Sequence, residues 1–479
     1  MKMDQMDRVG QGVEVDKGRT PSKPDRAPMT MPAPDPAPDR TASADAHSPM
    51  SMGGMATMAW VQPVLLLIGA WLIATPAALG GLGAALTWSD LASGVLLLLL
   101  AARALFGGGA HIPWVQAGVG VWLVLAPVIF RAPTAAGYLN DTLVGILVMV
   151  FAVLIPMSMP MPGPDRPAGW SYSPSSWVQR APMVALGFAG FYLARYMTAY
   201  QLGHIPTAWD PLFGTGTQRV LHSTIARSFP ISDAGLGATV YLLEALMGLM
   251  GDRRRWRTMP WMVMFFGLLV VPLGIVSVTL IILQPLTVGT YCTICLLTAL
   301  TTLGMIPLAL DEVVAMVQFL AQSRRDGRSV WRTFWLGGDA RDGGDDTHTA
   351  GFGARGTILA ADMLRGVTLP WTLMLSAALG VWLMFASFAL PITGRVAGSD
   401  VLLGALVATV ALAALAEVGR AARFINVLAG AWIVAAPWLL HGSMAATVNG
   451  ALVGVALVLL SLPRGTVRET YGGWARFIR

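Results

Sequence analysis

Two cysteines, Cys292 and Cys295, are the only thiols in the chain, and they stand at C-x-x-C spacing where an apolar run begins. If a helix starts here, both sulfurs lie on one face of its first turn, whose unsatisfied amide groups favour a thiolate. Such a position lowers the pKa of a cysteine and makes it reactive. A tetrahedral metal site would need two further ligands, and no second C-x-x-C and no H-x-x-x-H is present to supply them. The pattern therefore favours a redox-active pair, with a metal half-site and two inert buried thiols as the alternatives.

The composition is typical of an integral membrane protein. Hydrophobic residues make up 55% of the chain, charged residues make up 12%, and the mean hydropathy is +0.62. Soluble domains average about 25% charged residues, so the chain should contain many membrane spans. The basic residues are mostly arginines in short connections between apolar runs, which is where membrane topology places them. The positive charge therefore indicates contact with a lipid bilayer and argues against binding to nucleic acid.

Apolar runs long enough to cross about 30 Å of hydrocarbon recur along the chain. They predict an all-α polytopic membrane protein with about twelve transmembrane helices in three four-helix blocks. The predicted spans lie near 60–79, 90–106, 114–130, 139–155, 181–200, 234–250, 261–283, 292–310, 371–389, 400–416, 425–440 and 448–462.

The connections between these runs predict the domain boundaries. A proline-rich tail (1–57) without an apolar stretch should be disordered, and no cleavable signal peptide precedes the first span. The predicted domains that follow are a four-helix block (58–156), a polar linker (157–180), a central four-helix domain (181–322), a second polar linker (323–366) and a last four-helix block (367–479).

The first and last blocks repeat one short pattern, Gly-x-Trp followed by apolar residues. The four copies are Gly69–Pro76, Gly120–Pro127, Gly380–Ser387 and Gly430–Pro437, and Asp90, Asp141, Asp400 and Gly450 follow at matching positions, each four residues before another glycine. We interpret each copy as a transmembrane hairpin in which glycine lets helices approach, tryptophan lies at the membrane interface and proline ends the span. The blocks resemble the SPW-repeat family, with Ala436-Pro437-Trp438 as the nearest match to its motif, and the resemblance implies packing modules without chemistry of their own.

Arginines predict the orientation of the chain in the membrane. They follow or connect alternate spans: Arg253, Arg254, Arg255, Arg257, Arg324, Arg325, Arg328, Arg420, Arg423, Arg464, Arg468, Arg476 and Arg479. If these positions are inside, both termini are cytoplasmic and Cys292 is accessible from the outer face, where disulfides are made. We therefore expect a multi-pass protein of a cell membrane, of the bacterial inner or plasma membrane type.

The central block resembles the vitamin K epoxide reductase family. Three stretches carry the resemblance: Arg219-Val-Leu-His-Ser223, Phe229-Pro-Ile-Ser-Asp-Ala-Gly-Leu-Gly237 and Tyr291-Cys-Thr-Ile-Cys295. The resemblance implies a quinone of the ubiquinone or menaquinone type between four helices, with Cys295 against it and Cys292 exchanging disulfides with incoming thiols. It thus implies a membrane thiol oxidoreductase that couples dithiol oxidation outside to quinone reduction in the bilayer.

The outer loop between Gln201 and Asp233 departs from that family. Most members carry a second cysteine pair in this loop, but here Thr217 lies approximately at the second position and Asp210 or a neighbour near the first. A tyrosine that vertebrate members have after the inner cysteine is Ala299 here. Electrons must then come from a separate partner, a thioredoxin-like protein or a small thiol. The alternatives are a non-catalytic membrane assembly or scaffold protein with a degenerate redox core, and a metal-handling or small-solute membrane protein.

Three further residues are candidates for supporting the quinone. Ser223 matches a serine common in the family's loop and would donate a hydrogen bond to a quinone oxygen, although a loop serine is also a frequent helix N-cap. His222 would move a proton, although solvated loop histidines are commoner. Glu244 lies near the middle of its span with Arg195 as the counter-ion at similar depth, which predicts either a proton relay or a static ion pair.

Overall fold

The computed structural model of the protein describes residues 60–478, except 108, 110, 158–162, 341–342, 347–348, 350–351 and 353. The predicted disordered tail (1–57) lies outside these residues. Long helices dominate the described part, whose only β pairings are isolated bridges. The predicted all-α fold is confirmed.

Each predicted span corresponds to one long helix. The first block contains α2 (Val61–Leu79), α3 (Ala84–Leu105), α4 (Ile112–Ile129) and α5 (Ala135–Met157). The central block contains α6 (Trp177–Gln201), α9 (Asp233–Leu249), α11 (Pro260–Leu283) and α12 (Thr293–Arg325). The last block contains α15 (Trp371–Ala389), α16 (Gly394–Ala413), α17 (Ile425–Leu439) and α18 (Met444–Ser461). The apolar runs therefore predicted where the long helices lie, to within a few residues at most ends.

Ten helices of the described part are long and apolar enough to cross a membrane, as expected of a multi-pass membrane protein. The two central-block helices α6 and α9 are not among them. Helix α9 has only 17 residues, and α6 carries polar side chains such as Arg180 and Arg195. The predicted number of twelve spans therefore stays a prediction.

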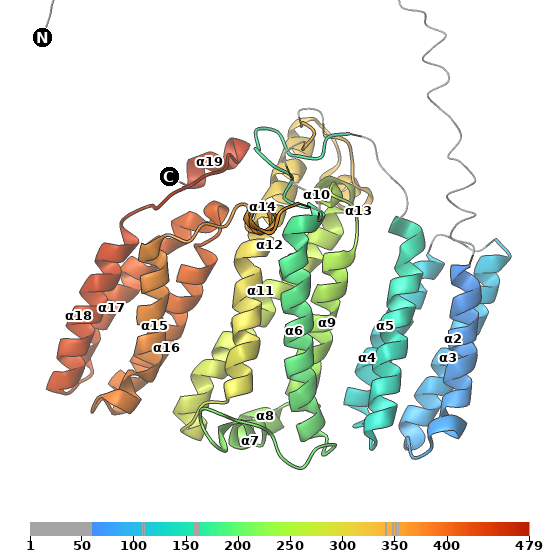
Figure 1. Cartoon of the computed structure of the whole chain (residues 1–479), viewed down its shortest axis with the longest axis horizontal. Coiled ribbons are helices and arrows are strands. Elements are labelled where there is room, and N and C mark those ends of the chain that lie inside the picture. Colours follow the sequence, from blue (N-terminus) through green and yellow to red (C-terminus); the bar gives the residue numbers. More distant parts are fainter. Residues whose placement is uncertain are drawn as a thin grey trace, which may run out of the picture. The chain divides into compact units, whose positions relative to one another are not determined.

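The four central helices run side by side (Figure 1), with α6 packed against α9 and α12, and α11 packed against α12. At one end of this bundle lie α7 (Gly216–Leu221), α8 (Thr224–Ser228) and a π-helical turn, η1 (Gln284–Val288). We call residues 202–232 and 284–292 the loop end. At the opposite end lie α10 (Arg255–Thr258), α13 (Val330–Leu336) and α14 (Gly356–Met363), and we call residues 163–176, 250–259 and 326–369 the linker end.

A buried ion pair holds the linker end together. Arg255 and Glu312 are each 1% exposed, and the Arg255 Nε and Nη2 atoms lie 2.5 and 2.6 Å from the two Glu312 carboxylate oxygens. The Ser175 hydroxyl also donates to Glu312, which ties the linker before α6 to α12. Arg180 donates to the backbone carbonyl of Met250 at 2.8 Å. The sequence assigned the arginines near 253–257 to membrane topology alone, but Arg255 also has a structural role.

The chain beyond α18 returns to the linker end. It includes two short segments, η3 (Gly472–Trp474) and α19 (Ala475–Ile478), and Tyr471 pairs with Trp170 of the first linker. The Tyr471 hydroxyl donates to Glu417 of the 3-10 helix η2 (Glu417–Phe424) at 2.9 Å. These contacts join the first linker to the last block through the C-terminal segment.

Glycines bring the two helices of each flanking hairpin into backbone contact, as the repeat predicted. A Cβ atom added at Gly94 would lie 2.7 Å from the carbonyl oxygen of Gly69, and the reverse substitution would give 2.9 Å. The other three copies show the same reciprocal contact: Gly120 with Gly145, Gly380 with Gly404, and Gly430 with Gly454. No side chain larger than hydrogen fits between these backbones without a shift.

The repeat tryptophans join the two hairpins of a block, beyond the interfacial role that the sequence predicted. Each indole N–H donates a hydrogen bond to a side chain in the other hairpin of its block. The acceptor is always the residue just before the repeat aspartate, or just before Gly450, which replaces that aspartate in the fourth copy. The pairs are Trp71 to Asn140 at 2.9 Å, Trp122 to Ser89 at 3.0 Å, Trp382 to Asn449 at 2.9 Å and Trp432 to Ser399 at 3.1 Å. Each block is therefore built from two hairpins that exchange equivalent hydrogen bonds.

This packing predicts opposite effects for two glycines of the first block. Gly145→Ala should lower the free energy of unfolding by about 1–3 kcal/mol, since its Cβ would lie 2.6 Å from the Gly120 carbonyl oxygen. Gly118→Ala, in the middle of α4 with open space around its Cβ, should leave stability unchanged or raise it by up to about 1 kcal/mol. Thermal unfolding in detergent would measure both, and equal stability of the two variants would contradict the packing argument.

Candidate functional site

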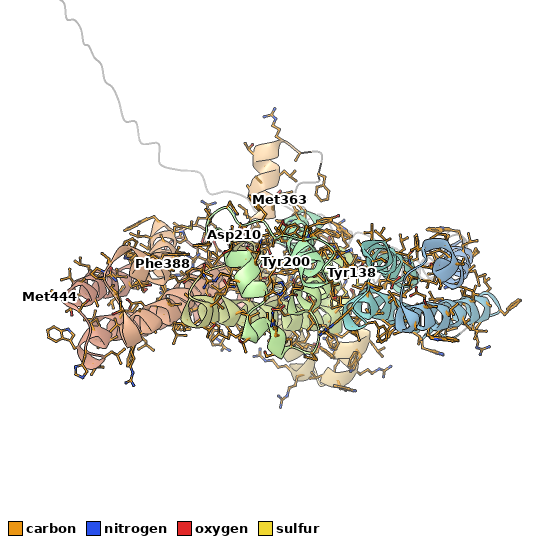
Figure 2. The ribbon with its side chains drawn as sticks, turned by 90° about the horizontal axis from the view of Figure 1, so that it is seen from below. Tyr138, Tyr200, Asp210, Met363, Phe388 and Met444 are labelled. Carbon is orange, nitrogen blue, oxygen red and sulfur yellow. A yellow bond between two sulfur atoms is a disulfide. The ribbon has the colours of Figure 1, made fainter. Side chains whose placement is uncertain are left out.

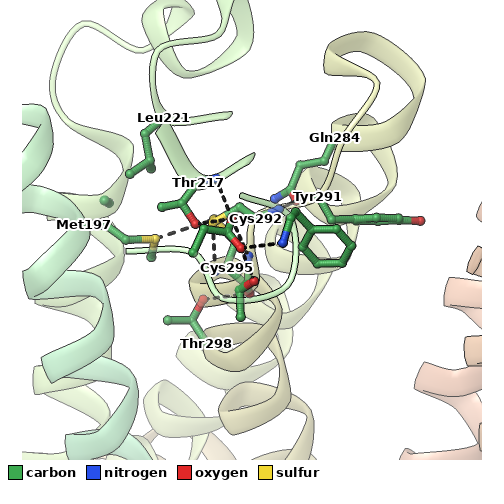
Figure 3. Close-up of a disulfide and its surroundings, with 12 residues drawn as sticks. Met197, Thr217, Leu221, Gln284, Tyr291, Cys292, Cys295 and Thr298 are labelled. Atoms are coloured by element: carbon green, nitrogen blue, oxygen red, sulfur yellow. Dashed lines mark hydrogen bonds between the residues drawn. A yellow bond between two sulfur atoms is a disulfide. The ribbon is translucent and has the colours of Figure 1, made fainter. Parts of the chain in front are cut away.

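The two cysteines form a disulfide at the N-terminus of α12, at the loop end. Cys292 is the residue that caps the helix, and its Sγ accepts a hydrogen bond from the Cys295 backbone N–H at 3.0 Å (Figure 3). The predicted pairing and the predicted place at a helix start are therefore confirmed. A thiolate formed at Cys292 on reduction would face the free amide groups of the first turn, which stabilise negative charge.

The two sulfurs differ in their surroundings. Cys292 is fully buried, in a cluster that includes Leu221 of α7, whereas Cys295 is partly exposed to a cavity. Although the side of the membrane that Cys292 faces stays a prediction, the residue is therefore not accessible to solvent in this structure, contrary to expectation. The reason is that α7 and the preceding loop pack over the start of α12, where Gly216 closely approaches the carbonyl oxygen of Tyr291.

An apolar cavity of about 190 Å³ lies beside Cys295, between the central helices and the loop end. Its apolar lining includes Ala194, Met197, Leu221, Ile225, Phe229, Ala234, Leu236, Val240, Leu273, Val276, Leu280 and Ile281. The cavity is smaller than the roughly 300–1,000 Å³ of sites for drug-sized ligands, so it has room for a small ligand such as a single ring system. A few polar groups lie on its wall: Ser223, Asp233, Tyr241, Ser277, Gln284 and Thr298.

Tyr241 of α9 brings a buried hydroxyl to this wall. The hydroxyl donates to the backbone carbonyl of Thr298 at 2.7 Å, and the Thr298 hydroxyl donates to the carbonyl of Cys295 at 2.8 Å. Sequence reasoning missed Tyr241, because it looked for a tyrosine on α12, where Ala299 stands. The sequence did contain a feature that could have indicated this residue, because Tyr241 is the single tyrosine within the apolar run of α9.

Gln284 fixes the backbone of the outer cysteine. The Cys292 N–H donates to Gln284 Oε1 at 2.9 Å. The π-helical turn that begins at Gln284 ends at Val288 and is capped by Gly289, whose φ of 73° only glycine adopts readily. On the other side of the disulfide, Met197 Sδ lies 3.5 Å from Cys295 Sγ. Sequence reasoning missed both residues, although an amide near the end of a long apolar run was a usable signal for Gln284.

Ser223 is a helix N-cap that also lies on the cavity wall, and its hydrogen bond to a quinone stays a prediction. Its hydroxyl accepts a hydrogen bond from the Ala226 N–H at 3.3 Å and so caps α8, and the residue also lines the cavity. His222 is exposed, packs against the Tyr200 ring with centroids 5.0 Å apart, and is not part of the cavity wall. The structure therefore places Ser223 on the wall of the cavity that Cys295 also lines and leaves His222 outside it, so a direct contact between His222 and a quinone is not supported.

Glu244 is buried in α9 but does not pair with Arg195. Both of its carboxylate oxygens lack a hydrogen-bond partner among the described residues, and the side chain is 1% exposed. The Arg195 guanidinium instead lies 3.3 Å from the centre of the Tyr138 ring in α5, because it points toward the first block. The expected Arg195–Glu244 ion pair is therefore wrong. Glu244 does not line the cavity either, and its role in supporting the quinone stays a prediction.

Asp210 connects the outer loop to the redox helix, at the loop end that Figure 2 views. Its Oδ2 accepts from the backbone N–H and the hydroxyl of Thr217 at 2.7 and 2.8 Å. Its Oδ1 accepts from the Phe213 N–H at 2.9 Å and from the hydroxyl of Thr293, which stands between the two cysteines. The two positions where loop cysteines were expected are thus joined by hydrogen bonds instead of a covalent bond. We call Asp210, Thr217 and Thr293 the Asp210 hub.

The hub should hold the loop in a pH-dependent way. Burial alone would raise the pKa of Asp210, but hydrogen bonds from Thr293, Phe213 and Thr217 outweigh it and lower the pKa from 3.8 to about 2. Since the folded pKa is depressed, this stabilisation is fully present above the ordinary value and is lost as the pH falls through about 2. We therefore expect a phosphine to reduce the disulfide increasingly fast as the pH falls from about 4 toward 2, relative to a small reference disulfide.

Asp210→Ala should remove that pH dependence. At neutral pH this variant should be reduced about tenfold faster than the wild type, because its loop no longer binds α12. Asp345→Ala, at an exposed acid of the linker end, is the matched control and should behave as the wild type. Equal reduction rates for Asp210→Ala and the wild type at every pH would contradict a role of the hub in covering the disulfide.

The structure thus places a disulfide at the N-terminus of α12, beside an apolar cavity. Residues 181–310 match the vitamin K epoxide reductase family, and residues 59–155 and 370–463 match the SPW repeat domain. The chain therefore carries a vitamin K epoxide reductase domain flanked by two SPW repeat domains, as the sequence predicted. No curated protein and no solved structure matches the chain. A domain of this family indicates a membrane oxidoreductase.

Proposed function

We propose that the protein is a membrane thiol oxidoreductase that transfers electrons from a dithiol to a quinone through Cys292 and Cys295. The observation that carries this proposal is the apolar cavity at Cys295, since it offers a ring-sized site next to the inner sulfur of a disulfide. Such a cavity admits a quinone from the hydrocarbon region, while the isoprenoid tail remains among the lipids.

The proposed reaction balances without a further reductant. A partner thiolate attacks Cys292, Cys295 leaves as a thiolate, and a second partner thiol releases the reduced pair together with a partner disulfide. Cys295 then adds to the quinone ring, Cys292 attacks Cys295, and the protein disulfide re-forms as the ring leaves as the quinol. One dithiol thus loses two electrons and two protons, and one quinone gains them.

The residues on the cavity wall have supporting roles in this scheme. The Ser223 hydroxyl lies on the wall and would donate to a quinone oxygen, which stabilises the charge that develops there. Tyr241 and Gln284 would position the ring and the outer cysteine, since each already holds a backbone group next to the disulfide.

The buried position of Cys292 restricts the partner. Either a small thiol passes between α7 and α12, or a thioredoxin-like protein displaces the loop that the Asp210 hub holds. The arginine-rich connection 252–257 lies at the linker end, opposite the disulfide, and arginines favour the cytoplasmic side (Figure 1). We therefore propose that the loop end faces outward and that the chain lies in a cell membrane of the bacterial inner-membrane type with its C-terminus in the cytoplasm.

The proposal is tested by turnover of the isolated full-length protein. Protein in detergent, supplied with dithiothreitol and a short-chain ubiquinone or menaquinone, should produce quinol faster than the uncatalysed mixture. The Cys292→Ser/Cys295→Ser double variant should show only the uncatalysed rate. Wild-type turnover by this double variant would exclude the proposed mechanism.

A further inference from the structure

The residue before the redox pair is anchored in the last block. Tyr291 is fully buried, and its hydroxyl donates to the backbone carbonyl of Met384 in α15 at 3.0 Å. Its ring lies 4.7 Å from the Phe385 ring and 5.7 Å from the Phe213 ring, measured between centroids. Figure 3 shows this ring pointing away from the disulfide. One side chain thus connects the turn that carries Cys292 to the SPW repeat domain.

The same turn is held on its other sides as well. The Cys292 N–H is bound by Gln284, and Gly216 of α7 meets the Tyr291 carbonyl so closely that a Cβ there would lie 2.1 Å away. Helix α16 also packs against α11 and α12, so the contact between the last block and the central block continues beyond Tyr291. The position of Cys292 therefore depends on three elements, one of which belongs to the last block.

One position of the repeat differs in the last block in a way that hairpin packing does not explain. Five residues after the repeat glycine, the four copies have Ala74, Leu125, Phe385 and Ala435. The aromatic residue occurs only in the copy that meets Tyr291, where it also stacks on Phe213 with centroids 6.2 Å apart. Hairpin packing does not require an aromatic ring at this position, since two other copies have alanine there.

From these contacts we infer that the last block positions the redox turn, with Phe385 and Tyr291 as positioning residues for Cys292. Helix α15 holds the Tyr291 ring, and Tyr291, the residue just before Cys292, thereby keeps Cys292 at the cap of α12 under the loop. The SPW repeat domain that contains α15 then helps to set the geometry of the redox site. This inference rests on the proposed function only in treating the cysteine pair as redox-active.

The test compares reduction of the disulfide in the full-length wild type and its variants, measured with dithiothreitol and thiol alkylation. Phe385→Ala introduces the residue that two other copies carry, and we expect reduction about tenfold faster because the Tyr291 ring loses the nearest of its aromatic neighbours. Tyr291→Phe keeps the ring but loses the hydrogen bond to Met384, and we expect about a fivefold increase. Trp432→Phe, which loses the bond to Ser399 in the same block but lies away from the turn, should match the wild type.

The reduction potential of the pair, measured in dithiothreitol redox buffers, separates positioning from general loosening of the block. It should shift in Phe385→Ala and Tyr291→Phe, return toward the wild-type value in Phe385→Tyr, and stay unchanged in Trp432→Phe. Wild-type rates and potentials in both test variants, or equal shifts in Trp432→Phe, would overturn the inference. None of these measurements uses a quinone, so absence of quinone turnover in the wild type would count against the proposed function alone.

Discussion

Cys295→Ser should abolish quinone reduction, with a loss of about a thousandfold or more in turnover. Cys295 is the sulfur that faces the cavity, and the other cysteine, Cys292, is fully buried and does not line the cavity, so it cannot take the place of Cys295. Thermal unfolding should change far less, because serine is close in size to cysteine and the surrounding helices keep their contacts. Stopped-flow measurement of quinol formation with dithiothreitol as the donor provides the comparison.

Cys292→Ser should stop the cycle at a different point. The Cys295 thiolate would still add to the ring, but no resolving thiol would release the quinol, so an adduct or a charge-transfer absorbance should accumulate. Mass spectrometry of the intact protein would detect the adduct at Cys295. Identical kinetics and identical spectra for the two single variants would contradict the assignment of an inner and an outer cysteine.

Arg255→Ala should be the most destabilising substitution at the linker end. It would leave the Glu312 carboxylate buried without its cation, and breaking a buried ion pair in this way costs about 3–5 kcal/mol. The free energy of unfolding in a mild detergent, measured with denaturant, would show the loss. Replacing both partners, as in Arg255→Met/Glu312→Leu, should recover a large part of it because no unpaired charge remains.

Arg253→Ala is the matched control for this experiment. Arg253 lies two residues away and contacts Asp165 at 3.2 Å, but its side chain is 56% exposed. Exposed ion pairs contribute about 0–1 kcal/mol, so this variant should unfold close to the wild type. A loss for Arg253→Ala as large as that for Arg255→Ala would show that positive charge in this segment matters, rather than the buried pair.

The long helices could be predicted from the sequence because each crosses or lines an apolar layer and therefore needs a continuous apolar run. Helix α15, for example, was predicted at 371–389 and is observed at Trp371–Ala389. The C-x-x-C pair could be predicted as well, because both cysteines lie within one helical turn. Boundaries were less accurate where a polar segment continues a helix, as in α12, which extends to Arg325.

The surroundings of the disulfide could not be predicted in the same way, since they come from segments far apart in the sequence. Depth in the membrane suggested Arg195 as the partner of Glu244, but depth says nothing about the direction in which a side chain leaves its helix. Asp210 and Thr217 were noted as replacements for cysteines, and only the fold shows that they bind each other and Thr293. The contact between Tyr291 and Phe385 joins two blocks that the sequence treated as separate.

The redox state of the Cys292–Cys295 pair in membranes, with and without an electron-accepting quinone, tests the central claim most directly. Membranes are incubated with a dithiol, quenched with acid and alkylated, and the thiols are counted by mass spectrometry. The account predicts that the dithiol form accumulates without quinone and that the disulfide returns when a quinone is added. A pair that stays in one state under both conditions would contradict thiol–quinone coupling and would favour a non-catalytic assembly protein.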